Sequence, residues 1–190
     1  VKIVGVSAGL TQGPDGATHQ ALDDVALVRQ LPGMTVLNPA DATEAYRAVV
    51  AAAEIATPVY IRLGRYPTPV IFGEDYRFEI GAVPVMRRGD DIVICATGIM
   101  TALALDTAEI LADQGIETSV LNVPTIKPLN MEAILDAALE KKLCVTMEEH
   151  WISDGLGRQL LGKYLLPFEV ASLLLLGVLV GAVVIARREV

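Results

Sequence analysis

The sequence predicts an α/β protein made of two mostly parallel α/β units followed by a single apolar helix. Strand-like and helix-like runs alternate as they do in βαβ units, and a stretch rich in Pro and Gly divides these runs near residue 80. The C-terminal end is strongly apolar, which explains the high mean hydropathy of +0.48. We therefore expect domains at residues 1–80, 81–157 and 158–190.

The composition excludes several classes of protein. With 53% hydrophobic and 20% charged residues, the chain of 190 residues can bury a sizeable core and is not a disordered segment. A net charge of −8 and an aromatic content of 5% argue against a nucleic-acid partner. Residues 158–190 hold four basic and two acidic residues, a charge of +2, so the other 11 basic and 21 acidic residues give an acidic body of −10.

The first unit opens with a strand-like run at residues 2–6. The sequence GPDG at residues 13–16 is typical of a tight turn, because Pro and Gly favour the backbone angles of turns. A helix is expected over residues 20–31, since two aspartates fall in its first turn, where the helix dipole favours negative charge. Pro32 and Gly33 end it.

The remainder of this unit alternates in the same way. Residues 34–37 form a short strand, and Asp41 and Glu44 have the spacing of a capping box that opens an Ala-rich helix to about residue 55. Residues 58–63 form the next buried strand. From residue 64 to residue 88 the periodicity breaks down, which indicates a linker or an irregular crossing.

The second unit restarts the pattern. Strands are expected at residues 91–96, 116–121 and 143–147, and helices at residues 100–114 and 130–140. Cys95 and Cys144 lie inside apolar strand runs and match no CxxC pattern. We expect both to be buried free thiols in a reducing compartment.

The tail differs in kind. Residues 170–186 are 17 residues without a charge, about 26 Å long as a helix at ~1.5 Å per residue, which approaches the ~30 Å of a bilayer core. Glu169 is either a functional carboxylate inside the membrane or a residue at the water interface. Two basic residues flank the segment on each side, so its orientation stays open. The alternative is that residues 165–186 pack as a buried helix on the second unit.

The residues alone give two candidate binding features. No Ser-His-Asp grouping, zinc spacing, Walker loop or GxGxxG motif occurs. His19 follows Asp15 by four residues in a Gly-bracketed loop, which could hold an anion beside a carboxylate and an imidazole, or could be a solvated turn. Arg62 and Arg65, at the end of an expected strand, suit a phosphate or carboxylate ligand. They could equally be ordinary surface arginines.

Several motifs together resemble the transketolase family. The segments at residues 13–20 (GPDGATHQ), 31–36 (LPGMTV), 38–41 (NPAD) and 58–69 (PVYIRLGRYPTP) resemble the second half of its pyrimidine-binding domain, as found in the split, two-subunit enzymes of prokaryotes. The segments at residues 96–98 (ATG), 125–129 (TIKPL), 148–150 (EEH) and 155–157 (GLG) are similar to its C-terminal domain. The resemblance covers residues 1–157.

The resemblance implies a role for individual residues. Asp15 matches the residue that recognises a sugar hydroxyl, and His19 matches a histidine near the thiazolium and the first carbons of the substrate. Arg65 matches the arginine that holds the sugar phosphate, with Arg62 as its neighbour. Ser7 stands where the family usually has a second histidine, eight residues before Asp15, which leaves phosphate or hydroxyl recognition at that position open.

The resemblance also implies cofactors and partners. A complete transketolase moves a two-carbon ketol group between sugar phosphates of the pentose phosphate pathway with thiamine diphosphate and Mg²⁺. The glutamate and the aromatic residues that bind the cofactor's pyrimidine would lie upstream of Val1, and the diphosphate and Mg²⁺ site further upstream or on another subunit. We therefore expect a cytoplasmic body that is inactive alone and that forms an oligomer with an N-terminal transketolase half or subunit.

The tail resembles another family. Residues 162–172 (GKYLLPFEVAS), 173–176 and 180–184 are similar to the last transmembrane helix of subunit J of proton-pumping NADH-quinone oxidoreductase. The chain is then a junction of two families near Gly157, and the tail would anchor the body to the cytoplasmic (inner) membrane. Two alternatives stay open: a membrane subunit of that oxidoreductase with a foreign N-terminal piece, or a non-catalytic partner-binding module.

Overall fold

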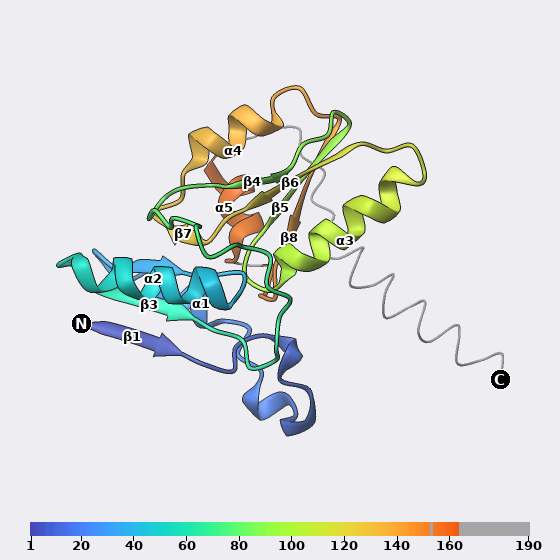
Figure 1. Cartoon of the computed structure of the whole chain (residues 1–190). Coiled ribbons are helices and arrows are strands. Elements are labelled where there is room, and N and C mark those ends of the chain that lie inside the picture. The colour runs from blue at the N-terminus through green and yellow to red at the C-terminus, as the bar shows by residue number, and fades with distance from the viewer. Residues whose placement is uncertain (153, 164–190) are drawn as a thin grey trace.

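The computed structural model describes residues 1–152 and 154–163. Within them the chain forms two four-stranded sheets, with strand orders β1-β3-β2-β7 and β4-β6-β5-β8 (Figure 1). In each sheet two of the three strand pairs are parallel and the third is antiparallel. The expected pair of mostly parallel α/β units is therefore confirmed.

The first sheet is covered by one helix on each face. Its strands β1 (Lys2–Gly5), β2 (Thr35–Leu37) and β3 (Val59–Arg62) lie between α1 (Asp24–Arg29) and α2 (Ala42–Glu54). On the α1 side, Val25 packs with Val36 and Tyr60. On the α2 side, Ala48 and Ala52 pack with buried side chains of β2 and β3.

The start of α2 has the N-cap hydrogen bond of the expected capping box, but the return bond from Glu44 reaches Ala40, one residue before the N-cap. The Asp41 carboxylate accepts a hydrogen bond from the Glu44 backbone N–H at 2.8 Å, and the Glu44 carboxylate accepts one from the Ala40 N–H at 2.7 Å. The second Asp41 oxygen accepts from the N–H groups of Ile71 and Phe72, at 2.7 and 2.8 Å. Asp41 therefore also fixes the path of the irregular segment that follows β3.

The segment before α1 departs from the expected single turn and long helix. Residues 10–19 form two 3-10 helices, η1 (Leu10–Asp15) and η2 (Ala17–His19), and α1 begins only at Asp24. In a helix begun at residue 20, the Ala26 N–H would donate to the Leu22 carbonyl. Here that carbonyl accepts from the Trp151 N–H at 2.9 Å and the Ala26 N–H donates to His150 at 3.2 Å, so contacts with the second unit replace the first helical turn.

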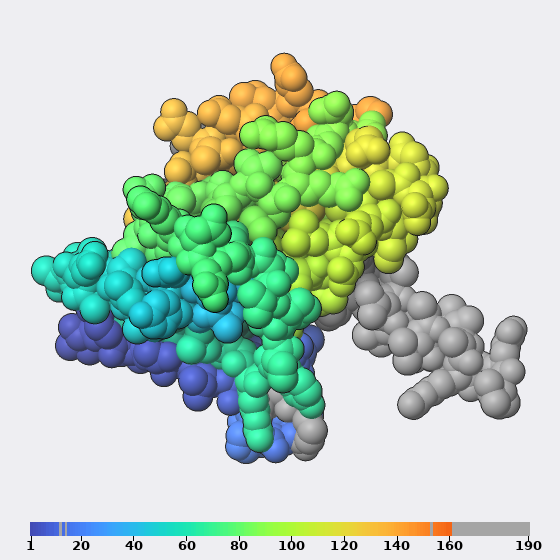
Figure 2. Space-filling model, viewed as in Figure 1, coloured from blue at the N-terminus to red at the C-terminus, as the bar shows by residue number. Residues whose placement is uncertain are grey.

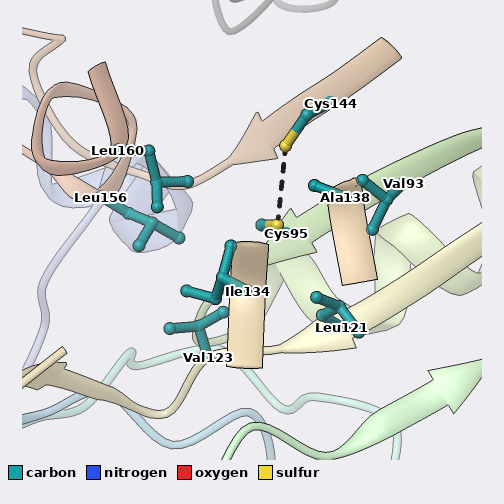
Figure 3. Packing of buried hydrophobic residues seen from close by; sticks show 9 residues of the cluster. All are labelled: Val93, Cys95, Leu121, Val123, Ile134, Ala138, Cys144, Leu156 and Leu160. Atoms are coloured by element: carbon teal, nitrogen blue, oxygen red, sulfur yellow. Dashed lines mark hydrogen bonds between the residues drawn. The ribbon is translucent and has the colours of Figure 1, made fainter. Parts of the chain in front are cut away.

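The second sheet comprises β4 (Val85–Arg87), β5 (Ile92–Ala96), β6 (Thr118–Asn122) and β8 (Leu143–Met147). Helix α3 (Met100–Ala112) covers one face, and α4 (Met131–Ala138) and α5 (Leu156–Lys163) cover the other. Figure 3 shows the cluster beneath α4 and α5, in which the sulfur atoms of Cys95 and Cys144 lie 3.9 Å apart. Both cysteines are free and buried, as expected. Helix α5 runs across the boundary expected at Gly157.

One short strand joins the two units. The strand β7 (Thr125–Lys127) lies in sequence between β6 and β8 of the second sheet, yet pairs antiparallel with β2 of the first sheet. The Lys127 ammonium donates to the carbonyls of Arg29 and Leu31, each at 2.7 Å. The alternation of strand-like and helix-like runs does not predict this strand.

Buried polar contacts continue the join. Glu44 is fully buried and accepts from the Asn122 side chain at 2.8 and 3.0 Å, and Asn38 donates to Thr97 at 3.1 Å. Burial raises the pKa of Glu44, against the lowering effect of its hydrogen bonds. Figure 2 shows the two units packed together, with the green segment after β3 on the surface between them.

The expected apolar helix at residues 165–186, with Glu169, lies outside the described residues. Among the residues that are described, no helix combines the length and the apolar character needed to cross a membrane.

Candidate functional site

The sequence-predicted site residues lie at the carboxyl ends of β1 and β3, next to the end of β8. Ligand sites of parallel α/β sheets usually lie at this edge. The Ala8 N–H donates to the Leu63 carbonyl at 3.2 Å, which holds the segments after β1 and β3 together. We call residues 7–23 the site loop, because Ser7, Asp15 and His19 all belong to it. Figure 1 shows its two 3-10 helices beyond the arrowheads of β1 and β3.

Asp15 and Arg65 form an ion pair between η1 and the segment after β3. The side chains are 36% and 57% exposed, respectively. An exposed pair of this kind contributes only ~0.2–1 kcal/mol to stability. The pair thus brings together two predicted substrate contacts in a position where solvent and ligands reach both.

His19 ends η2 in the same loop. Its ring is exposed, and its Nδ1 lies 3.0 Å from the Thr18 hydroxyl. The His19 N–H donates to the Gly16 carbonyl at 3.0 Å, and Gly16 has a φ of 75°, a region that glycine enters without strain. The turn at residues 13–16 therefore sets the path of the loop between Asp15 and His19.

Arg62 is buried, with 3% of its surface exposed, so its interpretation as an ordinary surface arginine is wrong. Its Nε donates to the two Asp24 oxygens at 2.9 and 3.2 Å, and its Nη2 donates to the carbonyls of Ala21 and Glu149 at 3.1 and 2.8 Å. Asp24 also accepts from the Tyr60 hydroxyl at 2.8 Å. Burial and this carboxylate raise the pKa of Tyr60. The role of Arg62 in substrate binding stays a prediction.

Ser7 is half-buried and has a φ of 65°, the one residue other than glycine with a positive φ in the described part of the chain. A non-glycine residue in this region is uncommon and persists where its surroundings fix it. Its place directly after β1 puts it at the same sheet edge as Arg65. Whether its hydroxyl contacts substrate stays a prediction.

Sequence reasoning did not predict that the segment after β8 contacts the site loop and α1. Glu149 is 8% exposed, and its Oε1 accepts from the N–H groups of Leu10 and Thr11 at 3.0 and 3.1 Å. His150 Nε2 accepts from the Ala26 N–H, and Nδ1 lies 2.9 Å from the Trp151 carbonyl, so the neutral ring carries its proton on Nδ1. Two acidic residues directly after a buried strand were the available signal.

A metal site is not evident among the residues described. Residues 1–152 and 154–163 contain no group of three or more His, Cys, Asp or Glu side chains that could hold an ion. The expectation that Mg²⁺ is held elsewhere in the complete enzyme stays a prediction.

Comparisons with known proteins identify the family. Residues 1–69 match the pyrimidine-binding domain of transketolase, and residues 81–164 match the transketolase C-terminal domain. The chain belongs to the transketolase family, which confirms the resemblance in the motifs.

The relatives include subunits of divided transketolases. The chain is 43% identical over 157 residues to the 6-deoxy-6-sulfo-D-fructose transketolase subunit SqwH of a Clostridium species, covering 83% of this chain and 49% of that protein. It is 38% identical over 158 residues to a subunit of the apulose-4-phosphate transketolase of Phocaeicola vulgatus, covering 83% and 51%. The chain thus spans about half the length of the curated relatives it matches.

Solved structures show the same architecture. A split-gene transketolase, described as an inactive β4 tetramer, superimposes with a TM-score of 0.81 at 43% identity, over 90% of this chain and 55% of that one. A Pichia stipitis transketolase variant superimposes with a TM-score of 0.66 at 26% identity, over 80% and 23%.

Proposed function

We propose that this chain is the C-terminal portion of a transketolase-type transferase that moves a two-carbon ketol group between sugar phosphates. The observation that carries the proposal is the exposed Asp15–Arg65 ion pair at the carboxyl edge of the first sheet, with His19 in the same loop. Membership of the transketolase family and its likeness to divided enzymes support it.

Arg65 binds the phosphate of the sugar in this proposal. Its exposed ion pair with Asp15 contributes ~0.2–1 kcal/mol, whereas a hydrogen bond to a charged group contributes ~1.5–3 kcal/mol. A bidentate phosphate contact therefore outweighs the pair that it displaces. The Asp15 carboxylate accepts a hydrogen bond from a sugar hydroxyl in the same proposal. In this proposal His19, in the same loop, donates or accepts a proton near the reacting carbons.

The complete enzyme uses thiamine diphosphate, as the matched domains imply. The cofactor, when bound, supplies the nucleophilic carbon that carries the two-carbon unit. We propose that the metal and the diphosphate are held by another part of the complete enzyme or by a second subunit. We expect a cytoplasmic oligomer, where the buried thiols remain reduced.

Kinetics of the complete enzyme containing this chain test the proposal. Arg65→Ala should raise KM for a phosphorylated donor such as xylulose 5-phosphate by about 10- to 150-fold, the equivalent of ~1.5–3 kcal/mol. The same change should leave the KM of an unphosphorylated ketose within about twofold. His19→Ala should lower kcat instead. Wild-type kinetics in both variants would remove this loop from the site.

The separated chain provides the complementary test. The chain alone should show no turnover and no submicromolar binding of thiamine diphosphate, because half a site positions the cofactor poorly. Adding the missing part should restore activity. Turnover by the chain alone would show that the site is complete within it.

A further inference from the structure

The segment that follows β8 holds the site loop at both of its ends. Three hydrogen bonds make this connection directly, from Leu10 N–H and Thr11 N–H to Glu149 Oε1 and from Trp151 N–H to the Leu22 carbonyl. A fourth contact runs through Arg62 of β3, whose Nη2 donates both to the Glu149 carbonyl and to the Ala21 carbonyl. We propose that Glu149 is a positioning residue that sets the conformation of the loop carrying Asp15 and His19. The inference rests on the proposed function, since it assigns a role within that site.

The side chain of Glu149 fixes the start of the loop. A single carboxylate oxygen accepts from two consecutive backbone N–H groups, and bonds to an ionised acceptor are stronger than bonds between neutral groups. Gly9 lies directly against this carboxylate, at a φ of 85°, and a Cβ at that position would overlap it. Three successive residues of the loop therefore take their positions from one buried carboxylate.

The backbone of Glu149 fixes the end of the loop. Arg62 connects the Glu149 carbonyl to the Ala21 carbonyl and to Asp24, the first residue of α1. The Gly9 N–H also donates to the Ala21 carbonyl at 2.9 Å, which closes the loop at its base. Asp15 and His19 lie on the exposed part between these two anchors. Their placement therefore depends on a buried residue of the second unit.

The neighbouring residue supplies a matched control. Glu148 also uses its carboxylate to accept from two backbone N–H groups, those of Leu156 at 2.6 Å and Gly157 at 2.9 Å. These groups belong to the start of α5 in its own unit, and burial raises the pKa of Glu148. Its replacement removes the same chemistry from a side chain whose hydrogen bonds go to the start of α5 and not to the site loop.

Hydrogen exchange of the full chain tests the anchoring. Glu149→Ala should raise amide exchange across residues 9–20 by about tenfold or more, as expected from losing two hydrogen bonds, and Glu149→Gln, which retains one carbonyl acceptor, should raise it less. Glu148→Gln should raise exchange at residues 156–157 and leave residues 9–20 unchanged. Gly9→Ala disturbs the same contact from the loop side and should match Glu149→Ala.

Kinetics of the complete enzyme test the positioning role. Glu149→Gln should lower kcat/KM for a phosphorylated donor by about 10- to 100-fold, while Glu148→Gln, at a similar loss of Tm, should lower it by less than about threefold. Unchanged exchange at residues 9–20 in Glu149→Ala would overturn the proposal, and so would equal kinetic losses in the Glu149 and Glu148 variants. If the wild-type enzyme lacks transketolase turnover, the proposed function fails, whereas the exchange data still decide whether Glu149 anchors the loop.

Discussion

Arg62→Met should destabilise the chain far more than the corresponding change at Arg65. Arg62 and Asp24 have side chains only 4% and 14% exposed, so the methionine leaves a buried carboxylate without its counter-ion. It also leaves the carbonyls of Ala21 and Glu149 without the Nη2 donor. Breaking a buried pair by removing one partner costs ~3–5 kcal/mol, which for a chain of this size corresponds to a fall in Tm of about 6–20 °C.

Urea unfolding followed by far-ultraviolet circular dichroism measures this change, because helices and strands make up the regular structure of the described part of the chain. Arg65→Met is the control, and its exposed pair predicts a loss below ~1 kcal/mol. Asp24→Leu added to Arg62→Met should recover part of the loss, since no unpaired charge then remains buried. Equal losses in the two single variants would refute the assignment of Arg62 as a buried structural residue.

Three further predictions concern stability and reactivity. Burial raises the pKa of Glu44. The stability linked to this group is therefore complete below its ordinary pKa of 4.5 and is lost as pH rises through the pKa of the folded state. The difference in unfolding free energy between wild type and Glu44→Gln should change across that interval, and a constant difference from pH 4 to 8 would contradict the raised pKa. Cys95 and Cys144 are buried, so a thiol reagent should label neither in the folded chain and both in urea, and rapid labelling without denaturant would contradict their burial. Truncation after Gly157 removes Leu160, which is 3% exposed, and should cost ~2–5 kcal/mol relative to a chain truncated after Lys163, which retains this contact; equal Tm values of the two truncated chains in thermal unfolding would contradict the burial of Leu160.

Local sequence signals predicted the elements that depend on neighbouring residues. The start of α2 forms where expected because Asp41 caps the Glu44 N–H and Glu44 accepts from the neighbouring Ala40 N–H, all within one turn. The first turn expected for α1 does not form, because His150 and Trp151 compete for the backbone groups of Ala26 and Leu22. Nothing within residues 20–31 reports a competitor more than a hundred residues away in the chain.

In the candidate site, too, local signals predict some residues, whereas others depend on contacts with distant parts of the chain. Asp15, His19 and Ser7 could be predicted as a group because one loop carries them and its motif resembles a known family, and their roles stay predictions. The interpretation of Arg62 as a surface residue was wrong, since a charged residue gives no local sign that Asp24 and two carbonyls will enclose it. The contacts of Glu149 could not be predicted because its hydrogen-bond donors are backbone N–H groups, which nearly every residue has.

The antiparallel pairing of β7 with β2 has a consequence for synthesis of the chain. The end of β7 at Lys127 is 65 residues beyond the end of β3 at Arg62, which at ~5–20 residues per second is about 3–13 s of translation. During this interval the nascent first sheet exposes the β2 edge, with its unpaired N–H and carbonyl groups open to other strands. The first sheet is therefore complete only after most strands of the second have been synthesised. A fragment ending at residue 80 would lack β7 and would keep the β2 edge exposed to pairing with other chains.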